Sequence, residues 1–422
     1  MSKSVWCLLL QLLILYTSGS AAEIQPPQII PTGPQTRPLQ LPDGSLRAYF
    51  SRFGKLFSVT STDGLEWSEP EVEFDLPFQN MGGGLSLLDS EGEVHVILTH
   101  GRGEGTPAET RFIDLWHCRT SETRAQWNEP KRIWEGYCGA VMDFKQLRSG
   151  RLVVPFAAWK KPGETVASDT GSNYTTVVTS IDGGDTWELS PSKLTSPCFA
   201  GYNGNNYGAI EPTILQLNDD RVWMLIRTQT GFLYESFSED GVNWSAAKPS
   251  RFHSSTSPAA LVRLPDERIV IVWNNCEQPP KYENAGVYGG RDALHAAISD
   301  DEGKTWRGFR EIYRDPFRND TPPKSGDRGT AYPVAFATRE GKLLIASGQG
   351  GRRNLIVLDP DWLLQTSQVE TFEDDLADWH VWKPFGPARG YWRDRTAGAE
   401  LIAYPTQQPA KVLHVRKPDE KS

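Results

Sequence analysis

Six polar residues lie in or beside apolar stretches and have side chains that could do chemistry: Arg37, Asp143, Glu211, Arg227, Arg291 and Tyr332. Four of them precede the end of a tight turn by an odd number of residues, seven for Arg37 and Asp143 and nine for Glu211 and Tyr332. Because side chains alternate along a strand, these odd offsets place all four on equivalent strand faces. We therefore expect them to converge from four strands.

Arg227 and Arg291 are flanked by apolar strand sequence. An unpaired guanidinium is costly in such surroundings unless it binds an anion. Arginine also matches a carboxylate with paired hydrogen bonds, so three arginines would select an acidic ligand over a neutral one. A phenol has an ordinary pKa near 10, so Tyr332 would need a carboxylate within hydrogen-bond reach to take its proton before it could act as a nucleophile.

A recurring turn indicates the elements that position these residues. An acidic residue followed by tryptophan recurs every 58 to 61 residues, and the acidic positions are Asp63, Glu122, Asp182, Asp240 and Asp301. The aspartate accepts backbone hydrogen bonds, glycine supplies a positive φ, and tryptophan buries its ring between sheets. A repeat of this length with short strands predicts the blades of a β-propeller.

Six hairpins accompany the five turns, so the repeats predict six blades, with the turn lost from the last one. We expect residues 23–34 to be an extended lead-in, residues 35–368 to form the propeller, and residues 369–422 to form a C-terminal segment. That segment is too short for a complete second domain and could be the start of an accessory β-sandwich. The predicted fold class is all-β, a six-bladed propeller with a short C-terminal β extension.

The turns resemble the Asp box, S-x-D-x-G-x-T-W, of sialidases and related propellers. The copies at Ser180 and Ser299 match it fully, those at Ser61 and Ser238 are one residue short, and the one at Thr120 is degenerate. The order of Arg37-Pro, Glu211-Pro-Thr, Arg227, Arg291 and Tyr332 is similar to the exo-sialidase superfamily over roughly residues 35 to 365. The boxes themselves are structural and also occur in propellers without catalytic activity.

The resemblance implies a role for each residue. Arg37, Arg227 and Arg291 would be the arginine triad that holds a substrate carboxylate, Tyr332 the nucleophile, and Glu211 its base. The loop that carries the family's acid/base aspartate is missing, because Ser51 to Phe57 runs straight into the first box. Asp143, or a member of the polar loop from His100 to Asp114, could take its place. The expected activity is an exo-glycosidase that removes sialic acid or a similar acidic sugar.

Two alternatives remain open on the same fold. A polysaccharide lyase or a rhamnosidase acting next to a uronic acid would keep a carboxylate site but depend on a histidine, such as His100 or His117, or on a tyrosine. A non-catalytic glycan-binding propeller would bind without turnover, and the missing acid/base residue is consistent with it.

Composition and the N-terminus limit the partners. Residues 1–22 have a basic start, a short apolar run and small residues at the end, which predicts a cleavable signal peptide and a secreted or periplasmic protein. The net charge of −9 and the absence of a basic run disfavour nucleic acid and anionic membranes. Scattered cysteines argue against a zinc site, and we expect no metal and no cofactor. No stretch after the predicted signal peptide is apolar enough to span a bilayer, so we expect no membrane insertion.

Overall fold

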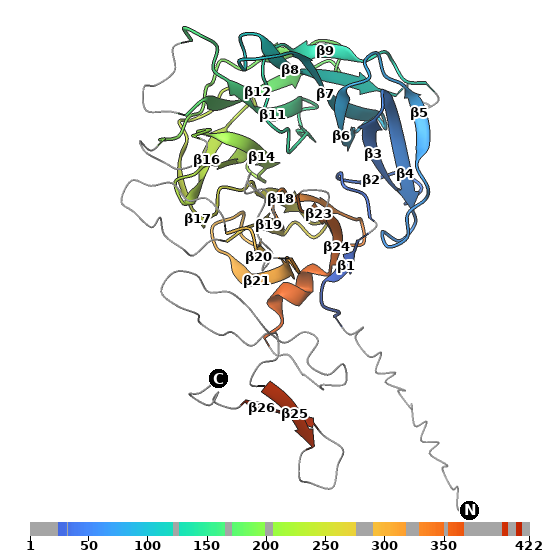
Figure 1. Cartoon of the computed structure of the whole chain (residues 1–422), viewed down its shortest axis with the longest axis vertical. Helices are drawn as coiled ribbons and strands as arrows, with labels where there is room; N and C mark the ends of the chain where they lie inside the picture. Colours follow the sequence, from blue (N-terminus) through green and yellow to red (C-terminus); the bar gives the residue numbers. More distant parts are fainter. Residues whose placement is uncertain are drawn as a thin grey trace, which may run out of the picture.

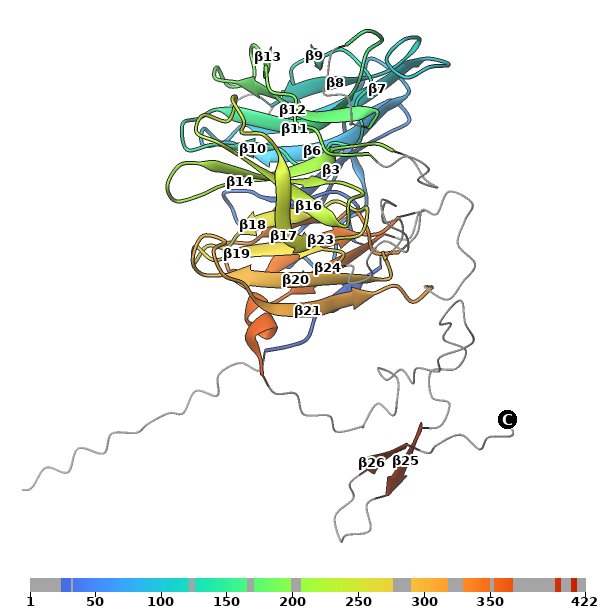
Figure 2. The same cartoon turned by 90° about the vertical axis from the view of Figure 1, so that its left-hand side faces the viewer.

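The computed structural model describes residues 24–31, 33–120, 126–164, 171–198, 206–275, 290–317, 329–349, 353–366, 399–403 and 411–415. The predicted signal peptide (1–22) and most of the predicted C-terminal segment lie outside these residues. Six antiparallel sheets of four strands each are arranged around a central axis (Figures 1 and 2). The predicted all-β, six-bladed propeller is therefore confirmed.

The first five blades each contain four strands that are consecutive in the sequence. Blade one contains β2 (Leu39–Gln40), β3 (Leu46–Arg52), β4 (Lys55–Ser61) and β5 (Glu71–Asp75). Blade two contains β6 (Met81–Leu88), β7 (Val94–Gly103), β8 (Arg111–Arg119) and β9 (Lys131–Trp134). Blade three contains β10 (Lys145–Gln146), β11 (Leu152–Trp159), β12 (Asn173–Ser180) and β13 (Glu188–Leu189).

Blade four contains β14 (Ile210–Gln216), β15 (Val222–Arg227), β16 (Phe232–Ser238) and β17 (Lys248–His253). Blade five contains β18 (Ala260–Arg263), β19 (Ile269–Trp273), β20 (Ala293–Ser299) and β21 (Arg307–Arg314). Blade six contains β22 (Val334–Ala337), β23 (Leu343–Ser347) and β24 (Asn354–Leu358), followed by the short 3-10 helix η1 (Pro360–Leu364).

The N-terminal strand β1 (Gln28–Ile30) supplies the fourth strand of blade six, where it pairs with β24 (Figure 1). This strand lies within the lead-in predicted for residues 23–34, so part of that segment belongs to the propeller. Blade six has lost its box, and its outer strand comes from the opposite end of the chain. This pairing closes the ring and covers an edge that would otherwise expose unpaired backbone groups.

Each blade buries one apolar layer against the next. The six layers lie between blades one and two, two and three, three and four, four and five, five and six, and six and one. Trp273 and Phe144 are among the largest fully buried side chains. Because both faces of most strands meet a neighbouring blade, strands such as β15 are buried along their whole length.

The boxes pin the turn after the third strand, as predicted. In blade three, Asp182 Oδ1 accepts hydrogen bonds from the Thr186 N–H at 2.9 Å and from Ser180 Oγ at 2.7 Å. The Trp187 indole N–H donates to the Gly184 carbonyl at 3.1 Å. Of the degenerate box in blade two, residues 121–125 lie outside the described part. In blade four the box begins at Ser238, which pairs with Val222 at the other end of β15 from Arg227. This box therefore stabilises the blade without contacting Arg227.

At the C-terminus, β25 (Ala399–Ala403) and β26 (Lys411–Val415) pair as an antiparallel hairpin. The rest of the predicted accessory segment lies outside the described residues. Within the described ranges, no helix combines the length and the apolar character needed to cross a membrane.

Candidate active site

The candidate residues of blades four, five and six meet where the inner strands begin. Glu211 lies at the start of β14, Arg227 at the end of β15 and Arg291 just before β20. Together with Tyr332, which precedes β22, they line one cavity of about 880 Å³. The structure therefore brings four of the six predicted site residues together.

Arg227 is the centre of this group. Its Nη1 donates to Glu211 Oε2 at 2.6 Å and to Tyr332 Oη at 2.9 Å, and its Nε donates to Thr256 Oγ1 at 3.2 Å. Its side chain is only 4% exposed, and that of Glu211 is 7% exposed. One buried guanidinium thus fixes the carboxylate and the phenol relative to each other.

Arg291 approaches the same phenol ring from blade five. Its Nη1 donates to Gln349 Oε1 at 2.6 Å, and its Nη2 donates to the Thr256 carbonyl at 2.5 Å. The guanidinium carbons of Arg291 and Arg227 lie 5.6 and 5.7 Å from the centre of the Tyr332 ring. Two cations on one ring favour negative charge in its neighbourhood.

The backbone is strained at two of these residues. Glu211 has a φ of 52° and Tyr332 a φ of 60°, in a region that residues other than glycine rarely adopt. The pairing of β14 with β15 shifts register between Ile210 and Thr213, so Glu211 sits in a β-bulge. A bulge breaks the alternation of a strand and redirects a side chain. Strain of about 1–3 kcal/mol per residue is retained where the surroundings enforce it, often at functional sites.

The surroundings set the ionisation of the phenol and of its main partner. Burial and the nearby charge of Glu211 raise the pKa of Tyr332, while Arg227 and Arg291 oppose this shift. Burial acts to lower the pKa of Arg227, but its electrostatic interactions and hydrogen bonds with Glu211 and Tyr332 outweigh burial and raise that pKa. Tyr332 is therefore a neutral phenol at pH 7, and Arg227 is a cation.

Arg37 and Asp143 form a separate buried pair. Arg37 Nη1 donates to Asp143 Oδ1 at 2.6 Å, and Arg37 Nη2 donates to the Phe144 carbonyl at 2.8 Å. The other Asp143 oxygen, Oδ2, accepts hydrogen bonds from Thr213 Oγ1 at 2.9 Å and from the Ile214 N–H at 3.0 Å. Asp143 is 2% exposed, and both of its oxygens have donors.

The electrostatics of Asp143 agree with a counter-ion. Burial would raise the pKa of its carboxyl, but Lys145, Arg37 and the Ile214 amide outweigh burial and lower it. The role of acid/base remains a prediction for Asp143, and this geometry lends it no support. The two odd-offset pairs thus form two groups: Arg37 meets Asp143, and Glu211 meets Tyr332 through Arg227.

A second cavity of about 1190 Å³ adjoins the first, and Tyr332 lines both. Arg37 lines this adjoining cavity, so two members of the predicted arginine triad line the first cavity and the third lines the second. Arg353, which the sequence reasoning missed, also lines it. Arg353 Nη2 donates to the Tyr332 carbonyl at 3.0 Å. Its signal in the sequence is an arginine directly before an apolar third strand, the same context as Arg291.

The other end of the first cavity is uncharged and aromatic. Tyr137, Trp159 and Tyr207 are partly buried and line it. The Tyr137 and Trp159 rings meet edge to face with centres 5.6 Å apart, and the Trp159 and Tyr207 centres are 6.4 Å apart. Such rings offer apolar faces with polar edges, which suits the apolar face of a sugar ring.

The histidines of the alternative mechanism lie elsewhere. His100 stacks on Phe78 with ring centres 4.0 Å apart. His117 is 1% exposed, and its Nε2 is 3.0 Å from His95 Nδ1. Neither histidine is among the described residues that line the two cavities around Tyr332. The structure thus gives no support to a histidine base beside this phenol.

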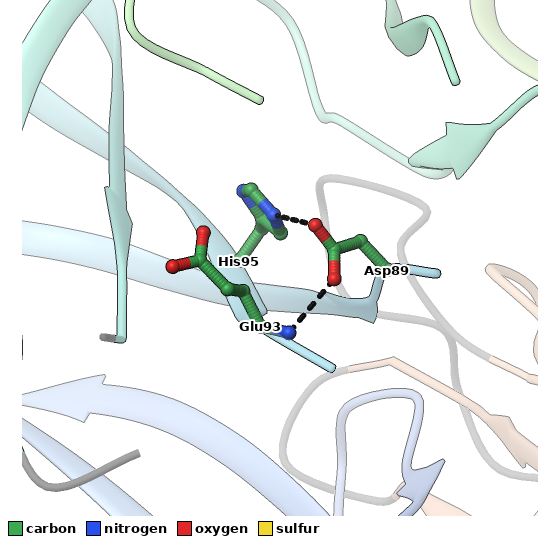
Figure 3. Close-up of side chains that lie close together, drawn as sticks. All are labelled: Asp89, Glu93 and His95. Carbon is green, nitrogen blue, oxygen red and sulfur yellow. Dashed lines mark hydrogen bonds and ion pairs between the residues drawn. The ribbon is translucent and has the colours of Figure 1, made fainter. Parts of the chain in front are cut away.

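One cluster has side chains typical of a metal site. Asp89, Glu93 and His95 place ligand atoms within 4.8 Å of one another (Figure 3). Asp89 Oδ2 is 3.1 Å from His95 Nε2, and Asp89 Oδ1 accepts the Glu93 N–H at 2.7 Å. Glu93 also pairs with Arg119 at 3.5 Å. These atoms already have partners in the protein, and the cluster lies at the first turn of blade two, at the end of the propeller away from Tyr332.

The fold and the cleft define a class: a six-bladed, sialidase-like propeller with a polar cleft at one end of its axis. A family model described as a BNR repeat-like domain matches residues 56–345. The chain belongs to the BNR repeat-like domain family. In a sequence comparison, no curated protein matches it.

Solved structures share the propeller at low sequence identity. A protein of unknown function from Dyadobacter fermentans is 16% identical with a TM-score of 0.55, and the match covers 80% of this chain and 98% of that one. Trypanosoma rangeli sialidase in complex with 2,3-difluorosialic acid is 11% identical with a TM-score of 0.51, covering 81% and 60%. Penicillium chrysogenum alpha-L-arabinanase is 14% identical with a TM-score of 0.50, covering 80% and 94%. These similarities establish the fold.

Proposed function

We propose that the protein is a secreted exo-glycosidase of sialidase type that releases a terminal acidic sugar from a glycan. The observation that carries this proposal is the buried contact of Arg227 with both Glu211 and Tyr332, at 2.6 and 2.9 Å. Arg291 adds a second guanidinium near the same phenol, so the site combines a carboxylate-binding element with a potential nucleophile. The aromatic end of the cavity suits the rest of the glycan.

The proposed reaction uses these groups in two steps. Tyr332 Oη bonds to the anomeric carbon while the glycosidic bond breaks, and the phenol proton passes to Glu211. Water protonates the departing oxygen and leaves hydroxide. A second water then attacks the anomeric carbon, the bond to Tyr332 Oη breaks, and Glu211 returns its proton to this oxygen. The proton lost by the attacking water neutralises the hydroxide. A neutral phenol avoids the repulsion that a carboxylate nucleophile would meet next to an anionic sugar. Arg227 contacts both groups. In this scheme it stabilises the negative charge of Glu211 and then the negative charge that develops on Tyr332 Oη.

The test is hydrolysis of a fluorogenic α-linked sialic acid substrate by wild type, Tyr332→Phe and Arg291→Ala. We expect Tyr332→Phe to lower kcat on the order of a thousandfold or more, and Arg291→Ala mainly to raise KM. Tyr234→Phe is the matched control, since this phenol lies in the apolar layer between blades three and four. Equal turnover by wild type and Tyr332→Phe would refute the proposal.

A second candidate is a glycan-binding propeller without turnover. One observation favours it: Glu211 is the single carboxylate among the described residues that line the first cavity. Such a protein would bind sialylated or uronic-acid glycans saturably, and Arg291→Ala would weaken binding, while no product would form. Equilibrium binding measured beside the hydrolysis assay separates the two candidates.

A further inference from the structure

Arg353 differs from Arg37 and Arg227 in its charge partners. Arg37 has Asp143 as its counter-ion at 2.6 Å, and Arg227 has Glu211 at 2.6 Å. Among the described residues, no carboxylate lies within ion-pair distance of Arg353. Residues 350–352, which precede it and lie outside the described part, are glycine, glycine and arginine, so none of them is an acid. Arg353 is thus a partly buried cation without a partner charge in the described structure.

Its hydrogen bonds are also incomplete. Within the described part of the chain, Arg353 donates only through Nη2, to the Tyr332 carbonyl at 3.0 Å and the Ala346 carbonyl at 3.5 Å. Its Nε is buried without a hydrogen-bond partner. An unpaired buried N–H and an unpaired charge each cost free energy. Burial also lowers the pKa of Arg353, because it destabilises the charged form of the guanidinium.

Support of the Tyr332 backbone alone does not account for this residue. A neutral donor such as glutamine could hold the same carbonyl without placing a charge in the interior. The side chain lines the cavity that adjoins the candidate site, with Tyr332 as a shared wall. A guanidinium that faces a cavity and lacks a counter-ion matches an oxyanion in both charge and hydrogen bonding.

We propose that Arg353 forms a second oxyanion site, in the cavity that adjoins the one lined by Arg227 and Arg291, which takes a sulfate or carboxylate group. In the context of the proposed function, the substrate then carries two acidic groups, one held at Arg291 and one at Arg353. The oxyanion reaches the terminal nitrogens of Arg353 from the cavity, since Nε is covered. Anion binding at Arg353 is an equilibrium property, so it holds or fails independently of hydrolysis.

The test measures thermal unfolding of the full chain against sodium sulfate, with sodium chloride keeping the ionic strength constant. Arg291→Gln serves as the background, because it weakens anion binding in the first cavity. We expect this variant to retain sulfate-dependent stabilisation. Adding Arg353→Gln should weaken the apparent sulfate affinity about tenfold or more, whereas adding Arg353→Lys should preserve most of it. Glutamine keeps a donor for the Tyr332 carbonyl, so the comparison isolates the charge.

Arg52→Gln in the same background is the matched control. Arg52 lines the same cavity but is exposed, with its guanidinium over the Phe53 ring. It should leave the sulfate response unchanged. Repeating the titration with sodium acetate distinguishes a carboxylate site from a sulfate site, and a response to either ion that Arg353→Gln removes supports the proposal.

An identical anion response with and without Arg353→Gln would overturn the second site. If Arg353→Gln does not fold, selenate soaked into crystals of the wild-type protein provides the second test. Anomalous density within hydrogen-bond distance of the Arg353 guanidinium supports the site. Density at Arg291 without density at Arg353 refutes it.

Discussion

Replacement of Asp143 by asparagine tests whether this residue is a counter-ion or an acid/base. The carboxylate is 2% exposed and accepts hydrogen bonds from Arg37 and the Phe144 amide on one oxygen and from Thr213 and the Ile214 amide on the other. An asparagine NH2 group would face a donor in either orientation. It would meet Ile214 N–H in one and Arg37 in the other.

The expected loss is large because the substitution leaves Arg37 buried without its charge partner. Removing one member of a buried ion pair destabilises a protein by about 3–5 kcal/mol. Asp114→Asn is the control: Asp114 is fully buried, but its partner Arg102 has a side chain that is 33% exposed and can be solvated. We expect about 1–3 kcal/mol for the control.

Urea unfolding followed by tryptophan fluorescence measures both losses, and hydrolysis of the fluorogenic substrate is measured in parallel under conditions where each variant is folded. A loss of 3 kcal/mol or more for Asp143→Asn, with activity per folded molecule reduced less than about tenfold, supports the counter-ion role. Near-native stability, within about 1 kcal/mol, together with a loss of kcat by a hundredfold or more, would refute this reasoning. Asp143 would then be the acid/base.

Three further predictions follow from the fold and the cleft. Hydrogen bonds from Thr186 and Ser180 lower the pKa of Asp182 to about 2, so its stabilising effect should be present above pH 4 and be lost as the pH falls toward 2. Asp182→Asn should therefore have a flatter acid-unfolding profile by circular dichroism. Trp159→Ala should raise KM for an oligosaccharide several-fold with kcat nearly unchanged, as steady-state kinetics can measure. Ile29→Asp should lower Tm by disrupting the pairing of β1 with β24, whereas the exposed Ile181→Asp should not.

The blades could be predicted from the sequence because the interactions that define them are local. The two complete boxes satisfy their own hydrogen bonds within eight residues, as Asp182 and Trp187 do in one and Asp301 and Trp306 do in the other. The position of β1 could not be predicted in this way. Three residues, Gln28 to Ile30, have no periodic pattern to read, and their partners on β24 lie at the other end of the chain. Ring closure is a long-range contact that local signals do not encode.

Side-chain alternation identified strands that carry site residues, but it predicted one group of four side chains where the structure has two groups. Arg37 and Asp143 share an offset and do meet. Glu211 shares its offset with Tyr332, and both contact Arg227 as predicted neighbours should. A bulge and a positive φ set the direction of the Glu211 side chain, however, so regular alternation is not the reason for this contact. Arg353 was missed because blade six has no box to mark the end of its third strand, so the register of that strand could not be read from the repeat.

The two strained residues connect the fold to the proposed chemistry. Pro212 favours an extended backbone with a negative φ at the residue before it, which is Glu211. The φ of Glu211 is instead 52°. Relaxation of Glu211 or Tyr332 to an ordinary extended backbone would turn the side chain away from Arg227 and leave a buried guanidinium unpaired. The hydrogen bonds at 2.6 and 2.9 Å therefore offset the local strain, and the strain in turn fixes both groups against one cation. Such mutual constraint holds a carboxylate and a phenol against the same guanidinium before any ligand arrives, which is the physical reason to propose the reaction at Tyr332.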